Sequence, residues 1–542
     1  MINGLGGYGG IRMGGLATGL DTDDIIKKML AGQQAKIDKT KQEREQIQWK
    51  QEIYRDIIKD VKNLQNTYFD ITSKDNLSSG KAFYDYEVKS SNESIITATA
   101  GQGTIEGNYT VDVKQLATGA RVSKQLGIDI TKSSKLSKVG ISGDDFTITI
   151  DGKKFEVKLD KGEDSTIEDL ASAIKNSTTA DGKEKLSKYV DVSFSEISKD
   201  FVIETKKTGK DAKIEVQTGA LAGFNNEIGK NSIMEVTTPK GGTGIVENEK
   251  NNFTIDGVSF NLKGTSDKEK INLNVTKDVD KTFNRFEEFL DKYNELVEKI
   301  NGKLTEKKEY KYKPLTDEQK KEMKEDDIKR WEERAKKGIL RNDSNLEKML
   351  RELRGTLFTS VNGSDESFGR HIGLDTTNDY KTAGQIKFSE DGKEKFKKAL
   401  LERPEDIMKL FTKKPDRAIY EKLDTEKTPK AERDKIIYEN SGIFSRMDSI
   451  LRNYVGAPGT ILNSSILTKY ANKQEDHSIT GVVSSNNLPD QIYRKDNLIK
   501  QLDKKLRERE ERLYRQFAIL EKSMTKYNAQ AGWLSQQFGG GM

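Results

Sequence analysis

The 542-residue sequence predicts an α+β multidomain protein, in which long terminal coiled-coil helices and a helical domain enclose inserted β-rich domains. Three observations lead to this fold class. Apolar residues recur at alternating steps of three and four over 26–68, and the same spacing returns over 499–538. Between them, residues 84–280 alternate apolar and polar side chains. The length exceeds what a single hydrophobic core supports, so we expect several domains.

The N-terminal helix is predicted to open within Asp21-Thr22-Asp23-Asp24. Asp21 and Thr22 can cap its first backbone N–H groups, and acidic residues suit the positive end of a helix. Its heptad seam is diluted by polar members, among them Gln33, Arg44 and Gln51. A polar residue on a seam lowers stability and selects partner and register.

The C-terminal helix is predicted from about residue 498 to residue 538, and its seam mirrors the first one. At 1.5 Å per residue it would be about 60 Å long. A helix with one apolar stripe cannot bury that stripe by itself. The two stripes are therefore expected to pair within the chain or to form an assembly surface with neighbouring chains, and the polar seam residues favour the assembly surface.

The β-rich region contains two predicted hairpins. Residues 146–150 and 153–157 flank an Asp-Gly turn, and residues 253–255 and 258–262 flank another. These similar hairpins suggest two related β-rich modules. A short helix follows the first hairpin, because Ser165-Thr166-Ile167-Glu168 has the form of a capping box with Ser165 as the N-cap.

Helical spacing returns after residue 280. Residues 283–300 carry apolar side chains at helical intervals, and a further helical region covers 317–360. The helical material is therefore divided around a β-rich insertion.

The composition excludes several kinds of chemistry. The chain has no Cys and only two His, His371 and His477, so disulfides, thiol nucleophiles and Cys-ligated metals are ruled out. We expect no catalytic, cofactor-binding or metal-binding residues, and we expect that the protein is not an enzyme.

Charge and hydropathy narrow the choice of partners. Residues 494–526 contain 11 Lys and Arg against 6 Asp and Glu. The intermixed acids favour a solvated coiled-coil face over a nucleic-acid groove. No run approaches the 18 or more apolar residues of a membrane span. We therefore expect neither a nucleic acid nor a membrane as partner.

The first residues lack the basic and apolar regions of a secretory signal peptide. The chain is therefore expected to be either cytosolic or exported without a cleaved leader, and the residues alone leave this choice open.

Both ends of the chain resemble the flagellar hook-associated protein 2 family, the bacterial flagellar filament cap proteins. Interior stretches agree with this resemblance. The segments that carry it are 15–23, 49–56, 107–113, 167–176, 510–517 and 532–537.

The resemblance implies that the chain is divided into four domains or regions. They are a terminal coiled-coil region (1–45 with 500–542), a helical leg domain (46–83 with 281–499), a β-rich head domain (84–122 with 236–280) and an outer β-rich, α+β head domain (123–235).

The resemblance also implies a function in assembly. An oligomeric plate at the filament tip would promote the folding and insertion of exported flagellin subunits during elongation. The implied partners are further copies in a ring, taken to be a pentamer, with flagellin, the hook–filament junction protein and an export chaperone at the C-terminal helix. The implied location is extracellular, at the distal tip of the flagellum, reached by the flagellar type III system without a cleaved signal peptide.

The seam residues are the expected assembly interface, because helices with a diluted seam order only with partners. These residues are Ile26, Leu30, Ile37, Ile47, Leu513, Phe517, Leu520, Met524, Leu534 and Phe538.

Two alternatives stay open at this point. The first is a surface adhesin whose head domains bind host mucin or glycans. The second is a hook–filament junction protein or a flagellin subunit, against which the Trp331 region and residues 533–537 argue.

Overall fold

The computed structural model describes residues 21–538, with gaps at 218–220, 222, 268, 365, 378–381, 424–427, 460–463 and 472–485. The chain divides into two compact units. The first unit comprises Met1–Ser79, Arg285–Ala399 and Glu405–Met542, and the second comprises Gly80–Asn284 and Leu400–Pro404.

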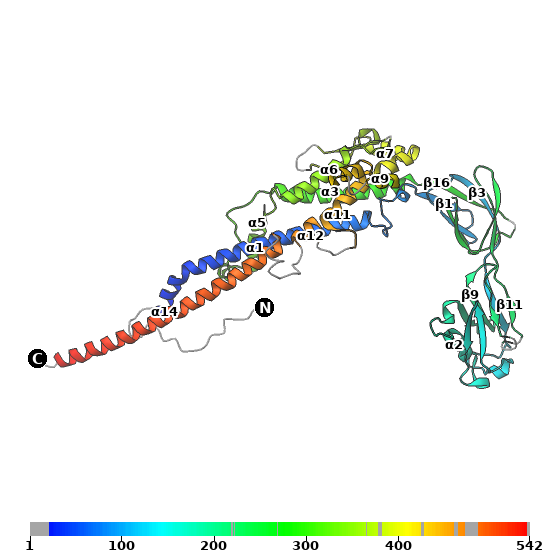
Figure 1. Ribbon diagram of the computed structural model, residues 1–542, viewed down its shortest axis with the longest axis horizontal. Helices are drawn as coiled ribbons and strands as arrows, with labels where there is room; N and C mark the ends of the chain where they lie inside the picture. The colour runs from blue at the N-terminus through cyan, green and yellow to red at the C-terminus, as the bar shows by residue number, and fades with distance from the viewer. Residues whose placement is uncertain are drawn as a thin grey trace. The chain divides into compact units, whose positions relative to one another are not determined.

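The first unit is mainly helical (Figure 1). The region expected to be helical over 317–360 consists of three helices, α4, α5 and α6. A short antiparallel ribbon pairs β17 (Leu374–Thr376) with β18 (Ile386–Phe388). The described α-helices that lie wholly or mostly in this unit are α1 (Thr22–Tyr68), α3 (Val279–Thr305), α4 (Asp317–Glu322), α5 (Glu325–Lys336), α6 (Ser344–Phe358), α7 (Gly392–Glu402), α8 (Pro404–Thr412), α9 (Arg417–Lys422), α10 (Lys430–Glu439), α11 (Ile443–Val455), α12 (Ile466–Ala471) and α14 (Leu488–Phe538).

An aromatic cluster forms the core of this unit. The ring of Phe286 on α3 lies 4.5 Å from that of Phe396 and 5.2 Å from that of Phe411. Phe289 packs edge-on against Phe444 at 5.0 Å. Because tilted and edge-to-face pairs are favourable beyond their buried area, this cluster holds α3, α7, α8 and α11 together. The helix predicted over 283–300 is confirmed, since these residues lie within α3 (Val279–Thr305).

The second unit consists mostly of antiparallel strands. Among its described residues, four sheets have the strand orders β1-β16-β3-β12-β13, β14-β15-β2, β10-β5-β6-β7 and β11-β4-β9-β8. The predicted α+β multidomain class, with helices at both ends and strands between them, is confirmed. The strands are β1 (Tyr86–Ser90), β2 (Ile96–Ala100), β3 (Gly107–Gln115), β4 (Gly119–Gln125), β5 (Phe146–Ile150), β6 (Lys153–Val157), β7 (Thr178–Thr179), β8 (Val190–Phe194), β9 (Asp200–Thr208), β10 (Glu215–Val216), β11 (Asn225–Glu227), β12 (Ser232–Thr237), β13 (Thr243–Asn248), β14 (Asn252–Ile255), β15 (Val258–Leu262) and β16 (Ile271–Lys277).

Both predicted hairpins are present. Strand β5 pairs with β6, and β14 pairs with β15. Each turn places Asp and Gly at positive φ, 49° and 77° at Asp151 and Gly152, and 48° and 78° at Asp256 and Gly257. Only Gly and a few short polar residues adopt this conformation readily, which is why the dipeptide marks the turn.

The buried apolar residues of this unit form two clusters. One gathers around Val111 and Leu273, and the other around Phe155, Ile174 and Phe201. The four-part division expected for the chain stays a prediction.

The capping box of α2 (Ile167–Asn176) lies one residue later than predicted. Thr166 is the N-cap, and its hydroxyl accepts from the Asp169 amide at 3.1 Å, while Asp169 accepts from the Thr166 amide at 3.0 Å. The prediction of Ser165 as N-cap was wrong. Ser165 lies one residue before the N-cap, and its carbonyl accepts from the Leu136 amide at 2.9 Å.

A buried arginine joins three helices of the first unit. Arg446 on α11 is 1% exposed, and its guanidinium donates to five backbone carbonyls near the C-terminal ends of α6 and α10. The ends of helices carry unpaired carbonyls and partial negative charge, which a cation stabilises. The five acceptors are the carbonyls of Thr356 (3.3 Å), Thr359 (2.6 Å), Ser360 (2.8 Å), Tyr438 (2.8 Å) and Glu439 (3.3 Å).

We predict that Arg446→Met destabilises the first unit by about 3–5 kcal/mol, because it removes the buried donor that these five carbonyls share. The measurement is the midpoint of thermal unfolding of the full chain. The matched control is Arg452→Met on the same helix, whose half-exposed side chain pairs with Asp448 at 2.7 Å. A pair of this kind contributes only about 0–1 kcal/mol. Equal losses in the two variants would contradict the role given to Arg446.

Candidate functional site

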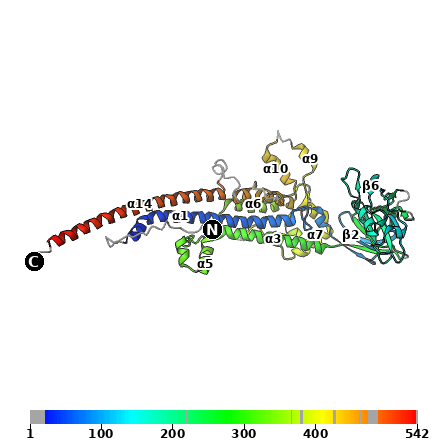
Figure 2. The same ribbon diagram turned by 90° about the horizontal axis from the view of Figure 1, so that it is seen from below.

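Helices α1 and α14 lie side by side and run antiparallel (Figures 1 and 2). Near the start of α1, the hydroxyl of Tyr514 donates to Asp23 at 2.7 Å. Further along α1, Lys495 forms an ion pair with Glu43 at 2.5 Å. Early residues of α1 thus contact late residues of α14, and the two predicted seams pair within the chain.

The sequence predicted the start of one helix correctly and missed that of the other. Asp21 caps α1, since its side chain accepts from the Asp24 amide at 3.0 Å. Helix α14 begins at Leu488, about ten residues before the predicted start. Pro489 lies in its first turn, where the missing N–H costs nothing because no intrahelical acceptor exists there.

An apolar cluster closes the helix pair near the start of α1. Ile26, Leu30 and Leu513 are 2%, 8% and 6% exposed, and Leu506 and Phe517 pack against them while only partly buried. Burying an aliphatic side chain contributes about 1.5–3 kcal/mol. Four of the predicted interface residues, Ile26, Leu30, Leu513 and Phe517, are therefore brought together within one chain.

Two more predicted residues lie on the middle of α1. Ile37 is buried and Ile47 is half-buried. The segment before α4 covers this part of α1, where Gln42 donates to the carbonyl of Pro314 at 2.6 Å. The burial of Ile37 is therefore complete in the single chain.

The last part of α14 is different. Leu520, Met524 and Leu534 are 45%, 38% and 45% exposed. Helix α1 begins at Thr22, and in both views α14 continues past that end (Figures 1 and 2). Phe538 is the last residue of α14, and its side chain lies outside the described part of the chain. The predicted seam is thus covered up to Phe517 and open beyond it.

Charges along the helix pair add little binding energy. Arg44 contacts Asp496 at 3.0 Å, and Arg515 contacts Glu511 on its own helix at 3.5 Å. Exposed pairs of this kind contribute about 0–1 kcal/mol each and are screened by salt. Of these two pairs only Arg44–Asp496 joins the two helices, and it selects their register more than it stabilises them.

One feature of α1 was not predicted. The buried carboxylate of Asp343 caps α6, binds Lys50 of α1 at 2.9 Å and accepts from the hydroxyl of Tyr54. Burial and this hydrogen bond raise the pKa of Tyr54 well above its ordinary value. The Asp before a predicted helix could have indicated the cap, but its contacts with α1 are tertiary.

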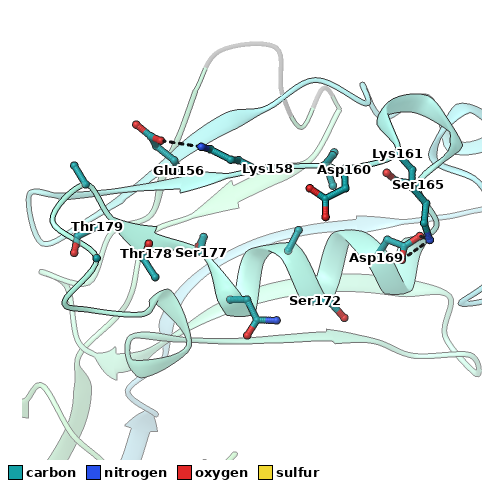
Figure 3. Close-up of a pocket in the computed structure, with 15 residues that line it drawn as sticks. Glu156, Lys158, Asp160, Lys161, Ser165, Asp169, Ser172, Ser177, Thr178 and Thr179 are labelled. Atoms are coloured by element: carbon teal, nitrogen blue, oxygen red, sulfur yellow. Dashed lines mark hydrogen bonds and ion pairs between the residues drawn. The ribbon is translucent and has the colours of Figure 1, made fainter.

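The second unit contains a polar groove of about 600 Å³ between β6 and α2 (Figure 3). An ion pair of Glu156 with Lys158 at 4.0 Å and one of Lys161 with Asp169 at 3.2 Å lie along it. The buried hydroxyl of Ser165 has no hydrogen-bond partner. The other lining residues are mostly small and polar, and none is aromatic.

The described part of the chain holds no candidate metal centre, since no group of three or more His, Asp or Glu side chains there could bind an ion. Among the same described residues, no helix is both long and apolar enough to cross a bilayer.

The chain resembles known proteins over most of its length. It is 25% identical to flagellar hook-associated protein 2 of Halalkalibacterium halodurans over 97% of this chain and 100% of that protein. It is 24% identical to the protein of that name from Thermotoga maritima over 80% of this chain and 60% of that protein. The D1-D2-D3 domains of the flagellar cap protein from Escherichia coli superpose with a TM-score of 0.49 and 16% identity, over 78% of this chain and 99% of that chain.

Two family models match the chain. The flagellar hook-associated protein 2 N-terminus model matches residues 18–120, and the C-terminus model matches residues 229–529, which alone is more than half of the chain. The resemblance seen in the sequence is confirmed. The chain belongs to the flagellar hook-associated protein 2 family of bacterial flagellar cap proteins.

Proposed function

We propose that this chain forms a homo-oligomeric cap at the distal end of the flagellar filament and promotes the folding and insertion of exported flagellin there. The observation that supports this is the division of α14. Its first part is held by α1, whereas its last part presents Leu520, Met524 and Leu534 to solvent. An uncovered apolar stripe on a long helix is typical of an interaction surface.

The stripe beyond Phe517 is the proposed assembly surface, together with Phe538 at its end. Ile26, Leu30, Leu513 and Phe517 hold the helix pair that positions the stripe. Ile37 is buried and Ile47 is half-buried within the chain. We therefore propose that these two residues stabilise the position of α1 and do not contact a neighbouring copy themselves. Weak, reversible contacts suit a cap that must step as subunits are added.

The finer features follow the family and are part of the proposal. The cap is a ring, taken to be a pentamer, that contacts flagellin and the hook–filament junction protein. Before assembly, an export chaperone binds the C-terminal helix, and the chain leaves by the flagellar type III route without a cleaved signal peptide. In this proposal the chain assembles other proteins and catalyses no covalent reaction.

The adhesin alternative has less support. The groove between β6 and α2 is a described cavity that a glycan could use, and its lining contains no aromatic ring on which a sugar could stack. We therefore propose the assembly function alone.

We predict that a chain truncated after Phe517 stays folded and monomeric and does not cap filaments. The contacts between α1 and α14 lie before this point, so the truncation removes only the open stripe. The measurements are circular dichroism, the mass in solution and the motility of a strain that lacks its cap protein. Restored motility with the truncated chain would show that the stripe is not needed.

We predict that two changes on one stripe have different effects. Replacing Leu520 and Met524 together by Ser removes about 3 kcal/mol of apolar contact from the assembled cap, or roughly a hundredfold in the association constant, and leaves the monomer unchanged. The matched change, Leu513→Ser, instead opens the helix pair, because Leu513 is buried against α1.

The readouts are the concentration at which half of the chains assemble and the hydrogen exchange of α1 in the monomer. Faster exchange of α1 is expected only in Leu513→Ser. If the Leu520 and Met524 variant assembled like the unchanged chain, the proposed surface would be wrong.

A further inference from the structure

The last part of α14 exposes large apolar side chains on a second side. Ile519 and Trp533 are 68% and 58% exposed. Successive residues of an α-helix are rotated by about 100°, so Ile519 lies about 100° around the helix from Leu520, and Trp533 about 100° from Leu534. Lys526 lies one heptad from each of them and is exposed as well. We call the side that carries Ile519, Lys526 and Trp533 the flank face.

The flank face is charged over the two heptads before Ile519, and one heptad further back it carries Leu498, which is 41% exposed. One and two heptads before Ile519, the same position of the helix carries Arg512 and Lys505. Both are exposed, as expected for the solvated side of a two-helix pair. Beyond them, two of the three residues at this position are large and apolar. The stem of Lys526 between them can lie along apolar surface while its ammonium stays in water. From Lys505 and Arg512 to Ile519, this side thus changes from charged to mainly apolar at about the residue where the seam opens.

A single partner helix covers one stripe, because helices pack along one line of contact. Leu520, Met524, Tyr527 and Leu534 form that stripe, which we call the seam face, and Tyr527 is 64% exposed. The flank face needs a second partner. A two-fold dimer uses one surface on both chains, whereas a closed ring needs two different surfaces on each chain.

We propose that the last part of α14 contacts two neighbouring copies of this chain, with the seam face of one copy against the flank face of the next. This inference rests on the proposed function, in which the chain forms a ring. Both faces extend over the same two heptads, from Ile519 to Trp533 and from Leu520 to Leu534. A fitting partner is therefore a helix of matching repeat, and α14 of another copy is such a helix.

The test uses the absence of cysteine in the chain. Two full-length variants are made, Tyr527→Cys on the seam face and Lys526→Cys on the flank face, so that both apolar flank residues are kept. Each is assembled alone and in an equal mixture, and then oxidised. Since a disulfide needs Cα atoms within about 7 Å, covalent dimers report direct contact of the two positions.

The control mixture replaces the flank variant by Thr525→Cys. At about 100° per residue, Thr525 lies about 100° around the helix from the middle of the flank face and further from the middle of the seam face. It is one residue from Lys526 and is exposed as well, so it differs from the flank position mainly in the direction of its side chain.

We expect covalent dimers in the mixture of Tyr527→Cys with Lys526→Cys, and none with either variant alone or with the control mixture. Dimers from either variant alone would mean that like faces meet each other, and would overturn the proposal. Dimers of equal yield in the control mixture would overturn it, because the contact would then not depend on the flank face.

The absence of dimers from every sample, although light scattering shows assembly, would overturn the pairing of the two faces as well. If light scattering showed only monomers, the proposed function itself would fail, so the two failures are distinguishable.

Discussion

The antiparallel pairing of α1 with α14 is the interaction that brings the two ends of the chain together and divides α14 into a held part and an open part. It joins residues 491 positions apart, as in the hydrogen bond from Tyr514 to Asp23, and returns the chain after the β-rich insertion. Because α14 continues beyond the start of α1 at Thr22, the pairing also determines where the apolar stripe becomes open. Because α14 extends past the start of α1, its first part packs within the chain and its last part is available to partners.

The pairing is built for selectivity more than for strength. The described apolar cluster has three buried members, Ile26, Leu30 and Leu513, while Arg44 meets Asp496 in a partly exposed pair. Polar and charged seam contacts lower stability and define register. Most of the stability of the unit comes from its helical core. There the aromatic cluster joins α3, α7, α8 and α11, and the buried Arg446 donates hydrogen bonds to the ends of two helices. Weakly paired terminal helices on a well-packed helical core suit repeated association and release.

Much of the fold could be predicted from local patterns. Heptad spacing predicted both terminal helices, and the Asp-Gly dipeptides predicted two hairpins, because each depends on residues close in sequence. The N-cap of α2 was placed one residue early, since Ser165 and Thr166 are both suitable caps, and in the structure Thr166 forms the capping box with Asp169. The roles of Arg446 and Asp343 depend on carbonyls and helices far away in sequence.

The candidate site was predicted as a stripe, but Leu513 and Leu520 follow the same pattern, and only the length of α1 separates the buried one from the exposed one.

Hydrogen exchange along α14, measured in the monomer and in the assembled particle, distinguishes the part of the helix held by α1 from the part open to partners. Exposed helix without a partner opens and exchanges readily, whereas packed helix is protected. We expect that residues 500–517 are protected in both states, and that residues 518–538 exchange fast in the monomer and slowly after assembly. Equal exchange of residues 518–538 in the two states would contradict it.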